Sequence, residues 1–140
     1  MLVGDQDADL PHLLRVLVGR CPCLAGVVVG GPQILLTRPP GEEWNPHDLV
    51  TDALGAPHLV GREMGAMSAG ERQRARVANA LAAPVAVVLL EEPLSLLDAP
   101  GRQAVWAALR TAADAGRAIV VVDSIDQQAA TVADRVITLT

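Results

Sequence analysis

Three nearly continuous apolar runs constrain the fold of this chain more than any other feature of its sequence. They lie at residues 85–90, 119–122 and 136–139, and they do not alternate between apolar and polar side chains. Strands of this kind are typical of a parallel sheet that is covered on both faces. Shorter β-branched runs lie at residues 2–3, 27–29 and 34–36. The sequence therefore predicts a buried, mainly parallel sheet.

Segments with a helical period separate these runs. Apolar residues recur every three or four positions in Leu10–Val18, Ser68–Ala82 and Pro100–Ala115. This alternation predicts an α/β domain in which helices flank a parallel core sheet. Residues 38–66 are instead rich in Pro and Gly and hold one short helical pattern near residues 46–54, which predicts a loop-rich insertion. We find no linker in the sequence and expect residues 1–140 to form a single domain.

The composition argues against several classes of function. All eleven basic residues are arginine, and the formal net charge is −5. Binding to nucleic acid or to an anionic membrane surface requires an excess of positive charge, which this chain lacks. The sequence has neither a signal-peptide pattern nor an apolar run of the roughly 20 residues that cross a bilayer. We therefore expect a cytoplasmic protein that contacts a membrane only through partner proteins.

The string MSAGE at residues 67–71 predicts the start of a helix. Ser68 and Glu71 have the spacing of a capping box, in which each side chain accepts a hydrogen bond from the backbone amide of the other residue. The small side chains of Ala69 and Gly70 leave the first amides of the helix open. An open helix N-terminus can bind an anion. An ordinary capped helix without a ligand explains the same residues.

Two adjacent carboxylates, Glu91 and Glu92, directly follow the apolar run at residues 85–90. The α/β folds bind their ligands at the carboxyl ends of parallel strands. At such an edge one carboxylate can hold Mg²⁺, and the other can orient or deprotonate a water molecule. The alternative is a solvated strand end with a turn at Pro93.

The order of these motifs resembles the C-terminal two thirds of an ATP-binding cassette (ABC) ATPase domain, which has a P-loop NTPase fold. The string MSAGE is similar to the family signature LSGGQ, and VVLLE at residues 87–91 is similar to the Walker B strand. The resemblance implies that Glu91 stands at the metal-binding position and Glu92 at the position of the catalytic glutamate.

Two further motifs follow in the family order. Ser95 to Asp98 match the D-loop, and ADRV at residues 133–136 matches the end of the switch region. Counted back from that string, the position of the switch histidine holds Ser124. Walker B carries Glu91 in place of the usual aspartate. The resemblance therefore implies that Glu91, Glu92 and Ser124 are remnants of a catalytic site.

The segment that aligns with the Walker A motif departs from the family pattern. Its first glycine, Gly4, is kept, whereas Asp9 replaces the second glycine, Leu10 the lysine, and Pro11 the Ser or Thr that would hold Mg²⁺. Carboxylates at this place repel phosphate, Leu10 provides no cation, and Pro11 lacks an amide donor. We therefore expect no working Walker A and no bound cofactor in the isolated chain.

The alignment also implies that parts of the family domain are reduced. The chain begins close to the Walker A strand, so we expect the preceding strands with the adenine-stacking aromatic to be absent. The insertion at residues 38–66 is shorter than in typical members. The expected architecture is thus a P-loop NTPase-like core with reduced N-terminal β and helical subdomains.

In the family, the signature of one subunit covers the ATP that is held by the P-loop of its partner. The resemblance implies that Ser68, Ala69, Gly70 and Glu71 can complete such a site in trans. The chain is thus expected to be a non-catalytic subunit, unable to hydrolyse ATP by itself, at the inner face of the plasma membrane. Its partner would be an intact ABC ATPase, an ABC permease or both, for which it is a scaffold or a regulator.

Three alternatives remain. In one, the chain supplies its signature to ATP hydrolysis by a heteromeric transporter, with ATP and Mg²⁺ shared between subunits. In another, it is a structural interaction module without nucleotide. A chromosome-maintenance or DNA-repair relative is disfavoured by the acidic balance and by the absence of a coiled-coil pattern.

Overall fold

A parallel sheet forms the centre of the computed structural model, which describes residues 2–4, 34–37, 54, 57–59, 61–83, 85–123 and 128–139. Within these residues five strands pair in the order β2-β3-β4-β1-β5, and every neighbouring pair is parallel. The strands are β1 (Leu2–Gly4), β2 (Ile34–Thr37), β3 (Val87–Glu91), β4 (Ala118–Asp123) and β5 (Ile137–Leu139).

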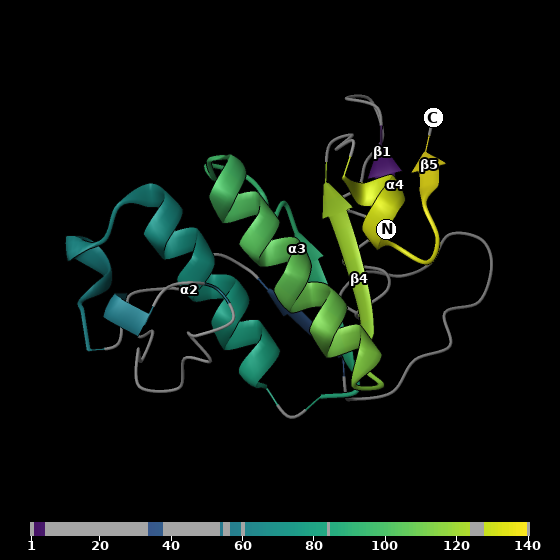
Figure 1. Ribbon diagram of the computed structural model, residues 1–140. Helices are drawn as coiled ribbons and strands as arrows, with labels where there is room; N and C mark the ends of the chain where they lie inside the picture. The colour runs from purple at the N-terminus through teal and green to yellow at the C-terminus, as the bar shows by residue number, and fades with distance from the viewer. Residues whose placement is uncertain are drawn as a thin grey trace, which may run out of the picture.

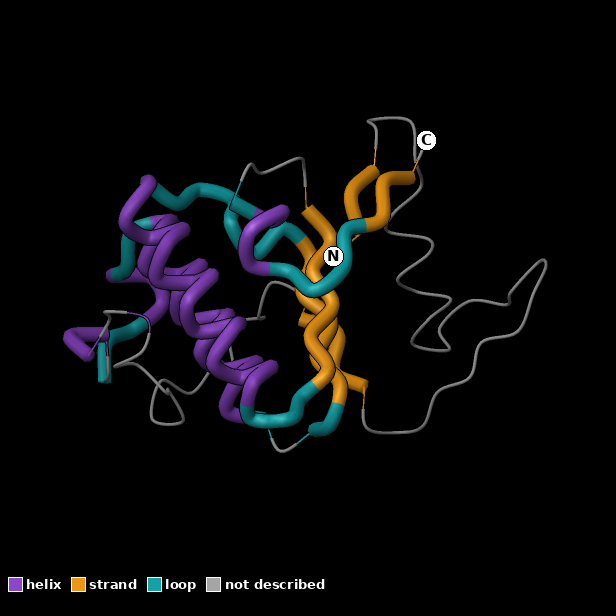
Figure 2. The backbone as a smooth tube through the Cα atoms, turned by 45° about the vertical axis from the view of Figure 1, so that its right-hand side comes forward, coloured by secondary structure: helices purple, strands orange, loops and turns teal. Residues whose placement is uncertain are grey.

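Two long helices pack side by side against this sheet (Figure 1). They are α2 (Ala69–Ala82) and α3 (Ala99–Asp114), and α4 (Ala129–Val132) is a single short turn. α2 connects β2 to β3 and α3 connects β3 to β4, so the chain steps twice in the same direction across the sheet. Right-handed crossovers in one direction place both helices on the same face. Figure 2 shows α2 and α3 together on one side of the strands.

The predicted strand and helix pattern is confirmed where the structure describes the chain. β3 buries its three central residues, Val88, Leu89 and Leu90. It begins at Val87 rather than Val85, because the carbonyl of Val85 accepts a hydrogen bond from the Arg117 side chain and not from a neighbouring strand.

Other predicted elements lie outside the described residues: the helix at 10–18, the strand at 27–29 and, apart from Leu54, the helix near 46–54. The described part of the predicted insertion holds two short 3-10 helices, Pro57–Leu59 and Met64–Ala66. The prediction of a single domain over the whole chain stays a prediction.

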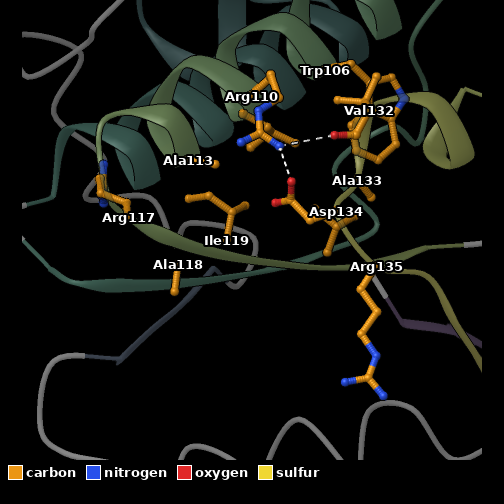
Figure 3. Close-up of a pocket in the computed structure, with 12 residues that line it drawn as sticks. Trp106, Arg110, Ala113, Arg117, Ala118, Ile119, Val132, Ala133, Asp134 and Arg135 are labelled. Atoms are coloured by element: carbon orange, nitrogen blue, oxygen red, sulfur yellow. Dashed lines mark hydrogen bonds and ion pairs between the residues drawn. The ribbon is translucent and has the colours of Figure 1, made fainter.

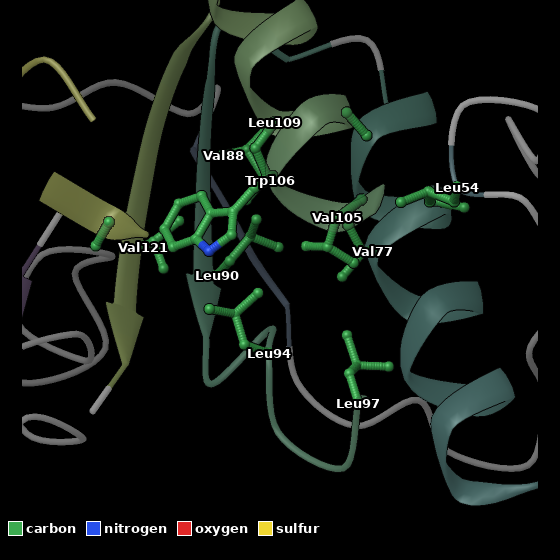
Figure 4. Close-up of a cluster of buried hydrophobic side chains, with 14 residues drawn as sticks. Leu54, Val77, Val88, Leu90, Leu94, Leu97, Val105, Trp106, Leu109 and Val121 are labelled. Carbon is green, nitrogen blue, oxygen red and sulfur yellow. The ribbon is translucent and has the colours of Figure 1, made fainter. Parts of the chain in front are cut away.

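The core between the helices and the sheet is almost entirely aliphatic. Trp106 on α3 is the only aromatic residue in the described part of the chain, and its indole reaches toward Leu90 of β3 and Val121 of β4 (Figure 4). Val77 of α2 and Val105 of α3 are also fully buried in this cluster. Most of the other buried positions of the two helices hold Ala or Gly, which allows the close approach of helix and sheet.

The carboxyl ends of three strands meet at one edge of the sheet. Val3 pairs with Asp123, and Glu91 pairs with Val122, so β1, β3 and β4 end nearly level. The next described strand after β1 is β2, at one edge of the sheet, whereas the next one after β4 is β5, on the other side of β1. Adjacent strands whose connections diverge form a topological switch point, where α/β folds bind their ligands.

The side chain of a residue just before β4 donates hydrogen bonds at the carboxyl end of α2. Arg117, one residue before β4, donates hydrogen bonds to the carbonyls of Leu81, of Ala83 at 3.0 Å and of Val85 at 3.2 Å. The last carbonyls of a helix have no partner within the helix, and α2 has no basic residue in its own last turn. Arg117 therefore satisfies the Leu81 carbonyl in the last turn of α2 and joins the segment that follows the helix to the start of β4.

We expect Arg117→Leu to lower the free energy of unfolding by about 2 kcal/mol, because it leaves several partly buried carbonyls without a donor. Arg102→Leu is the matched control, since Arg102 is exposed and donates to the carbonyl of Leu97 at 3.2 Å. Urea denaturation of both variants measures the difference. An equal loss in the two variants would contradict this role of Arg117.

Candidate functional site

The predicted capping box is present at the start of α2. The Ser68 amide donates to Glu71 Oε2 at 2.7 Å, and the Glu71 amide donates to Ser68 Oγ at 3.2 Å. Ser68 and Ala69 are exposed and Gly70 is partly exposed. Helix geometry leaves the amides of Ala69 and Gly70 without an intrahelical partner. The residues at the signature positions thus form an accessible helix N-terminus, whose dipole favours negative charge.

Glu71 is the centre of a small charged cluster. Its Oε1 lies 3.0 Å from Arg62 NH1 and 3.3 Å from His58 Nε2. The hydrogen bond from the Ser68 amide, together with the Ser68 side chain and the charge of Arg62, lowers the pKa of the Glu71 carboxyl to about 2. Both carboxylate oxygens are therefore occupied. Through His58 and Arg62, these contacts attach the described part of the insertion to the start of α2.

Glu91 and Glu92 follow the core of β3 as predicted, but their environments differ. Glu91 is the last residue of β3 and is partly buried, whereas Glu92 is exposed and has a backbone φ of 47°. This left-handed conformation costs a non-glycine residue of order 1 kcal/mol. It is held because the Glu92 amide donates to the Val122 carbonyl at 2.7 Å, which extends the pairing of β3 with β4 by one residue.

The turn after Glu92 contains the residues predicted to form a D-loop. The Ser95 hydroxyl donates to the Glu92 carbonyl at 2.9 Å, and Asp98 caps α3 by accepting a hydrogen bond from the Gly101 amide at 2.9 Å. Leu96 lies between them with a φ of 63° and is 70% exposed. Ser95 and Asp98 therefore shape the turn, and an apolar side chain projects from it into solvent.

The signature segment and this turn touch each other. A Cβ atom added at Gly70 would lie 3.2 Å from the carbonyl oxygen of Leu96 and 3.8 Å from Leu97 Cδ2. Only a residue without a side chain fits this approach without displacing the turn. The structure thus brings together two motifs that lie about 25 residues apart in the sequence.

Two buried polar residues that the sequence analysis did not single out brace the same turn. Gln73 of α2 donates from Nε2 to the Glu92 carbonyl at 2.7 Å, and Asp123 of β4 accepts from the Leu94 amide at 3.2 Å. A signal for Gln73 was available, because it shares the apolar stripe of α2 with Val77 and Ala80. A polar residue on a buried stripe must find hydrogen-bond partners.

Of the residues at the Walker A positions, the structure describes only the first, Gly4. Gly4 ends β1 at the switch point, while Asp9, Leu10 and Pro11 lie outside the described residues, as does Ser124. The described residues contain no group of three or more His, Cys, Asp or Glu side chains that could hold a metal ion. Glu91 and Glu92 have the oxygen chemistry that Mg²⁺ prefers, but alone they do not form a site for it.

A pocket of about 310 Å³ lies elsewhere, between the end of α3, the start of β4 and residues 132–135 (Figure 3). Trp106 and Ile119 contribute apolar surface to it. Arg110 at its rim donates to Asp134 at 3.0 Å and to Asp114 at 2.9 Å, so its charge is already compensated. The pocket is near the amino end of β4 and is separate from the edge that carries the candidate residues.

Comparison with known proteins gives related sequences for much of the chain, although no protein-family model matches it. The chain is 44% identical over 93 residues to a "Probable anion import ATP-binding protein" of Haloferax volcanii. It is 45% identical over 62 residues to the molybdenum import ATP-binding protein ModC of Albidiferax ferrireducens. These alignments cover 64% and 44% of this chain but 32% and 17% of the relatives. The chain thus spans about a third or less of their length.

The fold has solved counterparts. The ADP conformation of an ATP-binding cassette of an ABC transporter is similar with a TM-score of 0.78, over 99% of this chain and 74% of that chain, at 13% sequence identity. This likeness confirms the predicted P-loop NTPase-like fold of ABC ATPases, with a parallel sheet flanked by helices. Sequence relatives and structural neighbours both support the resemblance to the ATPase domain of ABC transporters.

The Glu71 cluster predicts a pH dependence of stability. The folded-state pKa of Glu71 is about 2 and its ordinary value is 4.5, so its contribution is complete above pH 4.5 and is lost as the pH falls toward 2. Glu71→Gln should therefore lower the free energy of unfolding at pH 7, and its difference from the original protein should shrink between pH 4.5 and 2.

Denaturant titrations at several pH values measure this difference. Glu63→Gln is the control, because Glu63 is exposed and its side chain caps no helix. A difference for Glu71→Gln that stays constant from pH 7 to pH 2 would contradict the role of the carboxylate charge.

Proposed function

We propose that this chain, which has the fold of ABC ATPases and sequence similarity to ABC transporter ATP-binding proteins, is a non-catalytic ABC ATPase-like subunit. It pairs with an active ABC ATPase, with a membrane permease or with both, as a scaffold or regulator. One contrast carries the proposal. The helix start at the signature position is fully formed, whereas Leu10 stands where the phosphate-binding lysine of Walker A belongs.

The sequence around Leu10 supports loss of nucleotide binding. β1 ends with Gly4 at the switch point, where a phosphate-binding loop would begin. The residues that follow bring carboxylates at positions 5, 7 and 9, and Pro11 removes an amide donor. A nucleotide phosphate would meet negative charge there instead of a lysine and open amides.

The signature segment supports a role toward a partner. Ser68 and Ala69 are exposed at the positive end of the α2 dipole, where they are accessible to a phosphate held by another subunit. The exposed Leu96 lies on the adjoining turn and offers apolar surface for a protein contact. Two copies of this chain would hold no competent ATP site, because both would lack a working Walker A.

A second candidate function is favoured by the intact capping box. In a heteromeric ABC transporter the chain would contribute Ser68, Ala69 and Gly70 in trans to ATP hydrolysis, with ATP and Mg²⁺ bound mainly by the partner. A third candidate, an interaction module without nucleotide, assigns the capping box a structural role only. In all three, Glu92 and Ser124 are vestigial.

The place of the protein in the cell follows from its proposed partners. The described residues contain no helix that is long and apolar enough to span a membrane. We propose that the chain lies at the inner face of the plasma membrane because a permease or its ATPase holds it there. The net charge of −5 makes nucleic acid an unfavourable partner.

The isolated chain should give no binding heat when it is titrated with ATP and Mg²⁺ in a calorimeter, because it lacks the lysine and the amide cradle. An intact ABC ATPase is the positive control. A dissociation constant in the micromolar range for the isolated chain would overturn the non-catalytic assignment.

Within a complex with an intact ABC ATPase, recovered by purifying the chain from its native cell, Ser68→Arg should abolish ATP turnover if the signature acts in trans. The long cation would occupy the helix N-terminus and remove the serine hydroxyl. Thr111→Arg on α3 is the control, since it places the same side chain at an exposed hydroxyl residue outside the site. Unchanged turnover in Ser68→Arg would exclude this second candidate.

The variant Ser68→Ala distinguishes the interaction module without nucleotide from the other two candidate functions. It should cost about 1 kcal/mol of stability as a lost helix cap. A purely structural module would show this loss with no change in the activity of any partner.

A further inference from the structure

Gln73 is buried in the helix that carries the signature, and both ends of its amide are engaged. It is 5% exposed and is, with Asp123, one of two buried polar or charged residues in the described chain. Its Nε2 donates to the Glu92 carbonyl at 2.7 Å, and its Oε1 accepts from Arg76 NH1 at 3.2 Å. A buried amide with one end unpaired would destabilise the fold, so this pairing fixes where Gln73 can sit.

Arg76 determines which way the Gln73 amide faces. A guanidinium only donates, so the amide oxygen must turn toward Arg76, and the NH₂ group is left to face Glu92. The reverse orientation would place oxygen against the Glu92 carbonyl and NH₂ against the cation. Two residues of α2, one helical turn apart, therefore direct a hydrogen bond at the backbone that follows β3.

The Glu92 carbonyl is the point at which the turn is fastened. It accepts from Gln73 Nε2, from the Ser95 amide at 3.2 Å and from the Ser95 hydroxyl, while the Glu92 amide donates to Val122 of β4. The residue keeps its left-handed backbone under these restraints. Of the groups that donate to the Glu92 carbonyl, Gln73 is the one that lies on α2. Its hydrogen bond therefore links the helix to the turn.

A second contact joins the same two segments one helical turn earlier. Gly70 lies so close to the Leu96 carbonyl that an added Cβ would be 3.2 Å away. The helix and the turn are thus in contact at residue 70 and hydrogen-bonded at residue 73. Two attachment points prevent the turn from pivoting about either one.

We propose that Gln73 is a positioning residue that locks the Glu92–Asp98 turn to the start of α2, so that the signature segment and the exposed Leu96 form one rigid partner-facing unit. The lock is a property of the isolated chain, and only the identity of the partner rests on the proposed function. A ligand or partner that displaces Ser68 to Gly70 therefore also moves the backbone of Glu92.

The test compares two variants of Gln73 with a matched control by amide hydrogen exchange and by amide chemical shifts in NMR. Gln73→Leu removes both hydrogen bonds. Gln73→Glu keeps an acceptor beside Arg76, whose buried Nε has no hydrogen-bond partner, but removes the donor that faces Glu92. Gln103→Leu makes the same chemical change at an exposed position of α3.

In both Gln73 variants the amides of Glu92 and Ser95 should exchange about tenfold faster, the effect of losing one buried hydrogen bond. The amide of Ala115, which donates to Thr111 at the end of α3, should keep its rate, and Gln103→Leu should change none of them. Unchanged exchange at Ser95 in both variants would overturn the proposal. Equal acceleration at Ser95 and Ala115 would also overturn it, since that pattern reports a general loss of stability.

The positioning role and the proposed function fail in different ways. Local exchange at Ser95 tests the lock in the isolated chain, without nucleotide or partner. In the complex, the Gln73 variants should weaken association with the intact ATPase about tenfold, because the Leu96 surface is no longer held. If the amide of Ser95 exchanges faster in the Gln73 variants but the chain binds no ATPase or permease, the positioning role of Gln73 is supported and the proposed pairing is excluded.

Discussion

The position of β3 between β2 and β4 determines most of the architecture. Its backbone is paired on both sides and its three central residues are buried, so the strand cannot shift without breaking two ladders and exposing Val88, Leu89 and Leu90. Parallel neighbours require a crossover before and after β3, and these crossovers are α2 and α3. The strand therefore places Glu91 and Glu92 at the carboxyl edge of the sheet. It also determines the positions of α2 and α3, which connect it to its two neighbouring strands.

The charges at the start of α2 complement this arrangement. The fifth position of the signature holds Glu71 rather than the Gln of the family pattern, and a carboxylate there would oppose a phosphate nearby. The structure compensates this charge internally, since the Ser68 amide, Arg62 and His58 all contact Glu71. Through its contacts with Arg62 and His58, Glu71 also joins the insertion to the helix.

Local features of this molecule could be predicted from its sequence, while distant pairings could not. The capping box was predictable because both partners lie within three residues and need only helical geometry. The parallel sheet flanked by helices was predictable from the apolar runs and from the resemblance, whereas the order of its strands was not predicted. The start of β3 was misplaced by two residues because Arg117, 32 positions later, binds Val85. Gln73 shows the same limit, since its burial follows from periodicity but its partner, 19 residues away, does not. The predictions at Asp9, Leu10, Pro11 and Ser124 stay predictions.

The three carbonyls bound by Arg117 have a consequence for the order in which the chain folds. The carboxyl-terminal turn of α2 is completed by a residue that lies 36 positions after Leu81. A growing chain that has emerged only as far as α2 has a helix whose last turn frays, because Arg117, which donates to the Leu81 carbonyl, has not yet been synthesised. The turn becomes stable when β3, α3 and Arg117 are in place. Residues 69–123 are thus expected to gain their structure in one cooperative step, at the rate of a non-local contact rather than that of an isolated helix.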